Sequence, residues 1–194
     1  MIVLNAHIQT YTGREINPLQ LQLGDIDIVD IAHSLSCINR FNGHTRFPIN
    51  VAQHSVYCAM LCRGTGFELQ ALLHDASEAY LGDVTKWLKH TSEMQAFREA
   101  EDRAQSVIFT KFGCPIIMAD AVEEADRIMV RFEGVKGFGP DFKIHHPNYS
   151  PLTSIQTERV NFAGTSPWLP WSWSESRERF LMFFNQYLKE YDVK

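Results

Sequence analysis

The pair His74-Asp75 lies inside an apolar segment, which reads Ala71-Leu72-Leu73-His74-Asp75-Ala76. The segment is hydrophobic enough to be buried. An imidazole and a carboxylate are costly to bury unless a cation pairs with them. Histidine nitrogens and carboxylate oxygens are also ligands of divalent metal ions in proteins. The pair therefore predicts a buried helix, over residues 67–80, that supplies two ligands to a divalent metal ion.

Two further ligands are predicted from other helical segments. His54 lies in segment 49–63, whose apolar residues follow helical spacing and which stops at Gly64. Asp126 lies at the edge of the apolar stripe of segment 115–133, where its side chain can reach a buried ion. His33 is the rival for the first histidine ligand, but the Val-Ala-Gln-His-Ser setting of His54 favours His54. For the remaining histidines a surface or structural role is preferred: His7, His90, His145 and His146.

The order His, His-Asp, Asp along three helices resembles the HD-domain metal-dependent phosphohydrolases. Ser36-Cys37-Ile38-Asn39-Arg40-Phe41 is similar to the arginine-aromatic motif of their 5′-deoxynucleotidase branch. Glu78 and the pair Gly82-Asp83 follow His74-Asp75 as they do in that branch. The resemblance covers about residues 31–89 and returns around Asp126. Within that branch the chain most resembles phage and bacterial deoxynucleotide phosphohydrolases of about this length, including phage enzymes that act on dATP.

We expect an all-α fold, an HD-domain helical bundle with a small N-terminal β-hairpin, in a single domain over residues 1–194. Apolar and polar residues alternate within residues 1–25, as they do in β-strands, around the turn signals Thr12-Gly13 and Asn17-Pro18. Residues 134–170 are rich in glycine and proline and are predicted to be irregular, as a lid or an oligomer contact. The predicted helices are 27–39, 49–63, 67–80, 92–112, 115–133 and 174–191.

Composition limits the classes of partner. A net charge of −5 argues against duplex nucleic acid, because lysine and arginine supply most nonspecific DNA affinity. No segment approaches the ~20 apolar residues of a membrane span, and the N-terminus lacks the pattern of a signal peptide. The four cysteines form no C-x-x-C pair, and core packing is the preferred role for Cys58 and Cys62. We therefore expect a cytoplasmic protein, in the host cytoplasm if a phage encodes it, and the resemblance implies a homo-oligomer.

Catalytic roles are predicted for Arg40 and for two acids beside the metal pair. Glu78 lies one helical turn after His74 and points the same way, so it is expected to position or deprotonate the attacking water. The rival is a solvent-facing glutamate. Gly82 lets the chain turn sharply, so that Asp83 overhangs the pocket. The resemblance implies that Asp83 contacts the sugar 3′-hydroxyl or assists Glu78, and the rival is a turn aspartate.

Substrate contacts are predicted from charged and aromatic side chains. Arg40 offers a planar fork for a phosphate, Lys89 matches the lysine of the family, and His44 and Arg46 lie on a nearby glycine-containing loop. Lys86 is expected to lie on the exposed surface.

Aromatic contacts complete the predicted site. Phe41 would close off the sugar 2′ position and so favour deoxyribose, because a buried unpaired hydroxyl is costly. Trp87 is the candidate for stacking on the base.

The expected reaction is metal-dependent hydrolysis of a deoxynucleotide at the α-phosphate. Mixed nitrogen and oxygen ligands suit Mn, Fe, Co, Ni or Zn better than Mg. The sharpest version converts dATP, or another dNTP, to the deoxynucleoside and triphosphate. The first alternative is a 5′-deoxynucleotidase that releases orthophosphate from dNMPs. The second is a noncatalytic nucleotide-binding module.

Overall fold

The computed structural model describes residues 6–140, 142, 151–163 and 168–192. These residues form an all-α fold with a small N-terminal β-hairpin, which confirms the predicted fold class. Strand β1 (Ile8–Gln9) pairs antiparallel with β2 (Glu15–Ile16). Asp30 accepts hydrogen bonds from the backbone nitrogen and the hydroxyl of Thr12, at 2.6 and 2.9 Å, and so fastens the hairpin to the first helix.

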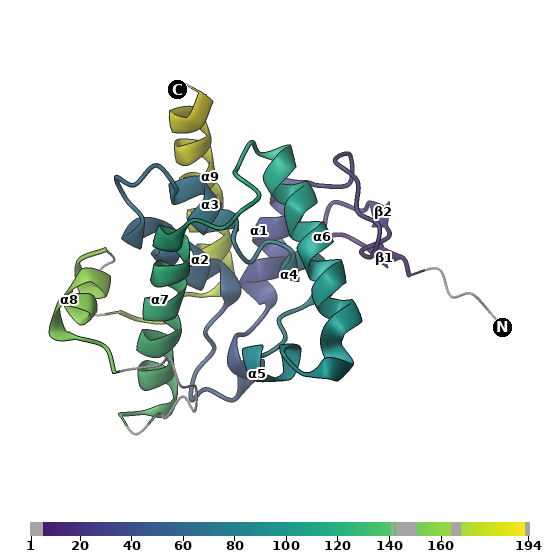
Figure 1. Cartoon of the computed structure of the whole chain (residues 1–194). Helices are drawn as coiled ribbons and strands as arrows, with labels where there is room; N and C mark the ends of the chain where they lie inside the picture. The colour runs from purple at the N-terminus through teal and green to yellow at the C-terminus, as the bar shows by residue number, and fades with distance from the viewer. Residues whose placement is uncertain (1–5, 141, 143–150, 164–167, 193–194) are drawn as a thin grey trace.

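Helix α2 (Val51–Leu61) is the centre of the fold and is buried on nearly every side. It begins at Asn50, whose side-chain oxygen accepts from the backbone nitrogen of Gln53 at 2.9 Å. A helix that is apolar all round is stable only inside a core. Figure 1 shows α6 and the hairpin on one side of the bundle and α7 and α8 on the other. The helices that pack on α2 are α1 (Ile28–Cys37), α3 (Glu68–Leu73), α7 (Asp120–Phe138), α8 (Ser154–Ala163) and α9 (Trp173–Asp192).

The helix predicted over residues 67–80 is in fact two helices, α3 and α4 (Glu78–Leu81), joined by a tight turn. Gln105 of α6 (Gln95–Lys111) stabilises this turn. Its side-chain nitrogen donates to the carbonyl oxygen of Leu73 at 2.7 Å, and its side-chain oxygen accepts from the nitrogen of Ser77 at 3.0 Å. The prediction of one helix was wrong because a distant side chain satisfies the backbone groups that the break exposes.

The helix predicted over 115–133 begins later and ends later, as α7. Before it, the side chain of Gln70 donates to the carbonyl oxygens of Pro115 and Ile117 at 2.8 and 2.9 Å. Its oxygen accepts from the nitrogen of Ala119 at 3.1 Å. These bonds hold the segment before Asp120 outside the helix.

The segment predicted to be irregular, 134–170, contains the end of α7 and all of α8. That prediction was wrong for these residues. Positions 141, 143–150 and 164–167 lie outside the described residues, and His145 and His146 are among them. A short helix, α5 (Lys86–Lys89), was not predicted either. No helix among the described residues is long and apolar enough to cross a membrane.

Candidate metal centre

The four predicted ligands converge from three parts of the fold. His54 comes from α2, His74 and Asp75 from the turn after α3, and Asp126 from α7. Nε2 of His54 lies 3.3 Å from Nε2 of His74, 3.3 Å from Oδ1 of Asp126 and 3.7 Å from Oδ2 of Asp75. Nε2 of His74 lies 3.3 Å from Oδ2 of Asp75 and 4.0 Å from Oδ1 of Asp126. Ligand atoms about 2.0–2.2 Å from one ion can be at most about 4.4 Å apart, so all these pairs are within reach of a single ion.

The orientation of both imidazoles also fits a cation. Nδ1 of His54 faces the carboxylate of Glu133 at 3.1 and 3.2 Å, and Nδ1 of His74 faces the carbonyl oxygen of Ala71 at 2.8 Å. Both partners only accept hydrogen bonds, so each Nδ1 donates and each Nε2 presents a lone pair. Two such lone pairs 3.3 Å apart, beside two carboxylates, require a proton or a metal ion between them. Outer hydrogen bonds of this kind are typical of metal-binding histidines.

Both carboxylates of the cluster are held in the ionised form. Burial acts to raise the pKa of Asp75, but His74, His54 and Arg40 together hold that pKa well below 3.8. Burial also acts to raise the pKa of Asp126, and its hydrogen bond with His54 lowers the pKa instead. The cluster therefore contains two half-buried negative charges that a cation would neutralise.

The pKa of His54 is raised by its surroundings. Burial and the nearby Arg40 act to lower its pKa, but Cys58, Glu133 and Asp126 outweigh them and hold it well above 6.5. A metal ion bound at Nε2 would compete with a proton for that nitrogen.

Cys58 was predicted to pack in the core, and it is buried, but it also lies at the cluster. Its sulfur is 3.4 Å from Nε2 of His54, one helical turn away. Burial raises the pKa of its thiol to about 11. The buried group of His54, Cys58 and His74 could hold a metal ion, because their ligand atoms lie within 4.8 Å of one another. Cys62 packs as predicted, with its sulfur 3.4 Å from the carbonyl oxygen of Ala121.

Glu133 is part of the site, and the sequence interpretation missed it. It lies on α7 two turns after Asp126, and its side chain is completely buried. Its carboxylate pairs with Nε of Arg40 at 3.0 Å as well as with Nδ1 of His54. The seven-residue spacing from Asp126 was the available signal, since it places both acids on one helix face.

Arg40 lies between Asp75 and Glu133, and only 8% of the residue is exposed. Its Nη1 is 3.2 Å from Oδ2 of Asp75, in addition to the pair with Glu133. Burial acts to lower its pKa, but these two carboxylates raise the pKa above its ordinary value. The guanidinium is therefore charged and shared between a predicted metal ligand and a buried acid.

Glu78 and Asp83 both interact electrostatically with Asp75 and Arg40. Glu78 is 5% exposed, and its Oε2 has no hydrogen-bond partner among the described residues. Burial, then the nearby Asp75 and Asp83, raise the pKa of Glu78 well above 4.5. Burial raises the pKa of Asp83 as well, and Asp75 adds to that effect. The turn before Asp83 uses a φ of +84° at Gly82, a value that favours glycine.

Lys89 lies next to Glu78, with Nζ 4.0 Å from its Oε1, and forms a closer pair with Glu101 at 2.6 Å. Phe41 packs edge-on against Phe138, with ring centroids 5.5 Å apart, just beside Arg40. Lys89 and Phe41 are thus both brought to the neighbourhood of the centre. Lys86 is exposed, as predicted.

The other predicted substrate residues do not pair with the four predicted ligands. His44 and Arg46 are exposed, and Trp87 is 45% exposed. In the described part of the chain, no hydrogen bond or ion pair joins their side chains to the four ligands. His33, the rival first ligand, stacks on Tyr11 instead, with ring centroids 3.8 Å apart. The geometry therefore favours His54.

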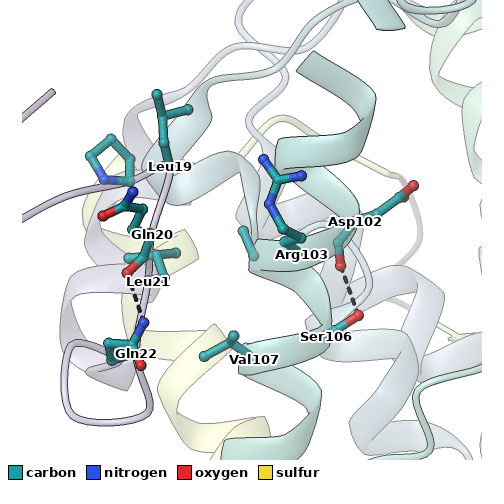
Figure 2. A pocket seen from close by; sticks show the side chains of 10 residues that line it. Leu19, Gln20, Leu21, Gln22, Asp102, Arg103, Ser106 and Val107 are labelled. Atoms are coloured by element: carbon teal, nitrogen blue, oxygen red, sulfur yellow. Dashed lines mark hydrogen bonds between the residues drawn. The ribbon is translucent and has the colours of Figure 1, made fainter. Parts of the chain in front are cut away.

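Two structural observations lie outside the centre. Of the three tryptophans after residue 167, Trp168 and Trp171 are buried against Tyr57, whereas Trp173 is 53% exposed. A surface cavity of about 580 Å³ lies between segment 18–22 and α6. Figure 2 shows Leu19 and Leu21 on one side of it and Arg103 and Val107 on the other. None of the predicted site residues lines this cavity.

The fold and the site together define an all-α protein with a candidate centre for a metal ion. No family model matches the chain. The chain is 39% identical over 126 residues to "Uncharacterized protein YfdR" of Escherichia coli (strain K12). The aligned region covers 65% of this chain and 69% of that protein. It is 33% identical over 141 residues to "Uncharacterized protein RCAP_rcc00048" of Rhodobacter capsulatus, covering 66% and 71%. The chain belongs to the protein family that includes YfdR and RCAP_rcc00048.

Proposed function

We propose that this protein is a metal-dependent phosphohydrolase of the HD-domain type that hydrolyses deoxynucleotides at the α-phosphate. The observation that carries the proposal is the convergence of four acceptor atoms on one point, beside a buried glutamate and a buried arginine. The atoms belong to His54, His74, Asp75 and Asp126. A site made only for stability has no need to place two histidine lone pairs against two carboxylates.

These four residues would hold the ion, and the mixed nitrogen and oxygen donors suit Mn, Fe, Co, Ni or Zn better than Mg. A divalent ion bound there would polarise a phosphate oxygen and make a bound water more acidic. Glu133 and the carbonyl oxygen of Ala71 keep both imidazoles in the tautomer that ligation requires.

Glu78 is the group proposed to handle the proton. A general base works best when its pKa lies near the working pH, and burial together with Asp75 and Asp83 raises the pKa of Glu78 in that direction. Its Oε2 has no hydrogen-bond partner among the described residues and is available to a water. Glu78 would take the proton of the attacking water, and Asp83 would support it or contact the sugar 3′-hydroxyl.

Arg40 and Lys89 are the proposed phosphate contacts. Glu133 holds Arg40 through Nε, which leaves its terminal nitrogens for phosphate oxygens, with one of them shared with Asp75. Phe41 would stand against the sugar and exclude a 2′-hydroxyl. His44, Arg46 and Trp87 are exposed, so their proposed contacts would be with the outer phosphates or the base.

The test is product analysis after incubation of purified protein with Mn or Co and each dNTP, dNMP and matching ribonucleotide. Deoxyadenosine with intact triphosphate from dATP is the expected result. Orthophosphate from dNMPs alone would assign a 5′-deoxynucleotidase. Glu78→Gln is the matched control, since it keeps the four ligands. Binding without turnover, equal in wild type and in Glu78→Gln, would overturn the enzyme proposal in favour of a noncatalytic nucleotide-binding module.

The resemblance of the sequence to the HD-domain phosphohydrolases also leads us to propose a homo-oligomer. We propose that it acts in the cytoplasm, or in the host cytoplasm if the protein is phage-encoded. Light scattering coupled to size-exclusion chromatography measures the oligomeric state directly. A strictly monomeric, active protein would contradict it.

A further inference from the structure

Cys58 lies at the metal centre, but the four-ligand set proposed above does not use it. We propose that the thiolate of Cys58 is a fifth protein ligand of the metal ion, which makes this a centre with a sulfur donor. The inference rests on the metal centre of the proposed function and specifies its chemistry further.

The distances place the sulfur within reach of the same ion. A zinc ion lies about 2.3 Å from a ligating sulfur and about 2.1 Å from a ligating imidazole nitrogen, so the two atoms can be at most about 4.4 Å apart. The sulfur of Cys58 is 3.4 Å from Nε2 of His54, and this is the nitrogen that faces His74 and Asp126. The sulfur thus lies beside the two histidine ligands, since the ligand atoms of His54, Cys58 and His74 are all within 4.8 Å of one another.

The helix itself brings the two ligands together. His54 and Cys58 are four residues apart on α2, so their side chains lie on one face, one above the other. Both residues are fully buried. A sulfur ligand held this way needs no movement of the backbone.

Cys62 shows what a packing cysteine looks like on the same helix face. It lies one turn beyond Cys58, and its sulfur contacts the carbonyl oxygen of Ala121 rather than the cluster. It is also buried and free. The two cysteines are therefore a matched pair, of which only Cys58 is placed to ligate.

A thiolate ligand has two chemical consequences. It favours zinc or cobalt over manganese and magnesium, because sulfur is a soft donor. It also raises the number of protein ligands from four to five.

The experiment is absorption spectroscopy of the metal-free full-length protein titrated with Co²⁺. A cobalt-thiolate bond gives an intense near-ultraviolet charge-transfer band, whereas nitrogen and oxygen ligands give only weak visible bands. We expect the charge-transfer band in wild type and in Cys62→Ser, and its loss in Cys58→Ser. We also expect Cys58→Ser to lose at least about tenfold in zinc affinity, and less than that in manganese affinity.

The outcomes separate the two proposals. Cobalt binding with visible bands but without the charge-transfer band in wild type would overturn the role of Cys58 and leave the centre intact. Failure of wild type to bind cobalt would overturn the centre itself. Should Cys58→Ser not fold, a band that survives in Cys37→Ser, Cys62→Ser and Cys114→Ser would assign the sulfur to Cys58 by difference.

Discussion

Glu133→Gln is the most informative single substitution, because Glu133 joins a proposed metal ligand, His54, to the buried arginine. Its carboxylate accepts from both His54 and Arg40. Glutamine keeps the shape, but it removes the negative charge that pairs with Arg40, and its amide nitrogen then faces the N–H of His54, because Nδ1 lies 3.2 and 3.1 Å from the two carboxylate oxygens. The substitution should therefore weaken the protein and its metal centre together.

The magnitudes follow from the contacts. Breaking a buried ion pair by removing one partner costs about 3–5 kcal/mol, and we expect the lower end because Arg40 keeps its pair with Asp75. At roughly 2–4 °C per kcal/mol for a chain of this size, the unfolding temperature should fall by about 6–12 °C. Loss of the outer hydrogen bond to His54 should lower metal affinity by about 10- to 100-fold.

Two assays measure these effects separately. Thermal unfolding of the metal-free protein, followed by circular dichroism, reports the stability change. Calorimetric titration with Mn²⁺ or Co²⁺ reports the affinity. Glu123→Gln is the control, because Glu123 is an exposed glutamate of the same helix, and its change should stay within about 0.5 kcal/mol. Wild-type stability and wild-type metal affinity in Glu133→Gln would refute the bridging role.

Further predictions concern the centre and its substrate. Asp75→Ala should lose both metal and activity, and activity in a metal-free Asp75→Ala protein would be incompatible with the mechanism. Glu78→Gln should bind metal as wild type does and lose about 10²- to 10⁴-fold in kcat, which calorimetry and product assays measure together. Phe41→Ala should raise turnover of ribonucleotides relative to deoxynucleotides, and an unchanged ratio would remove Phe41 from sugar selection. Metal affinity should fall as pH falls through the raised pKa of His54, since a proton then occupies Nε2, and a pH-independent affinity across that range would contradict this competition. In the metal-free protein the same raised pKa contributes stability that is complete below 6.5 and is lost as pH rises through the folded-state pKa.

Much of the helical architecture was predictable because it depends on local pattern. The apolar spacing around His54 and Asp126 marks the buried faces of α2 and α7, and Asn50 is the cap that begins α2. Local pattern failed where distant side chains compete with the helix. Gln105 stabilises the break between α3 and α4, and Gln70 delays the start of α7.

The sequence by itself predicted the types of the proposed ligands and the segments that carry them, since His54, His74, Asp75 and Asp126 each follow from a local motif. Only the tertiary structure decided that Glu133 lies 3.1 Å from His54, although 79 residues separate them, and that Cys58 rather than Cys62 faces the cluster. The physical reason is that packing of α7 against α2 sets which polar atoms share a buried space. Burial of that space then determines which groups must pair and which pKa values shift.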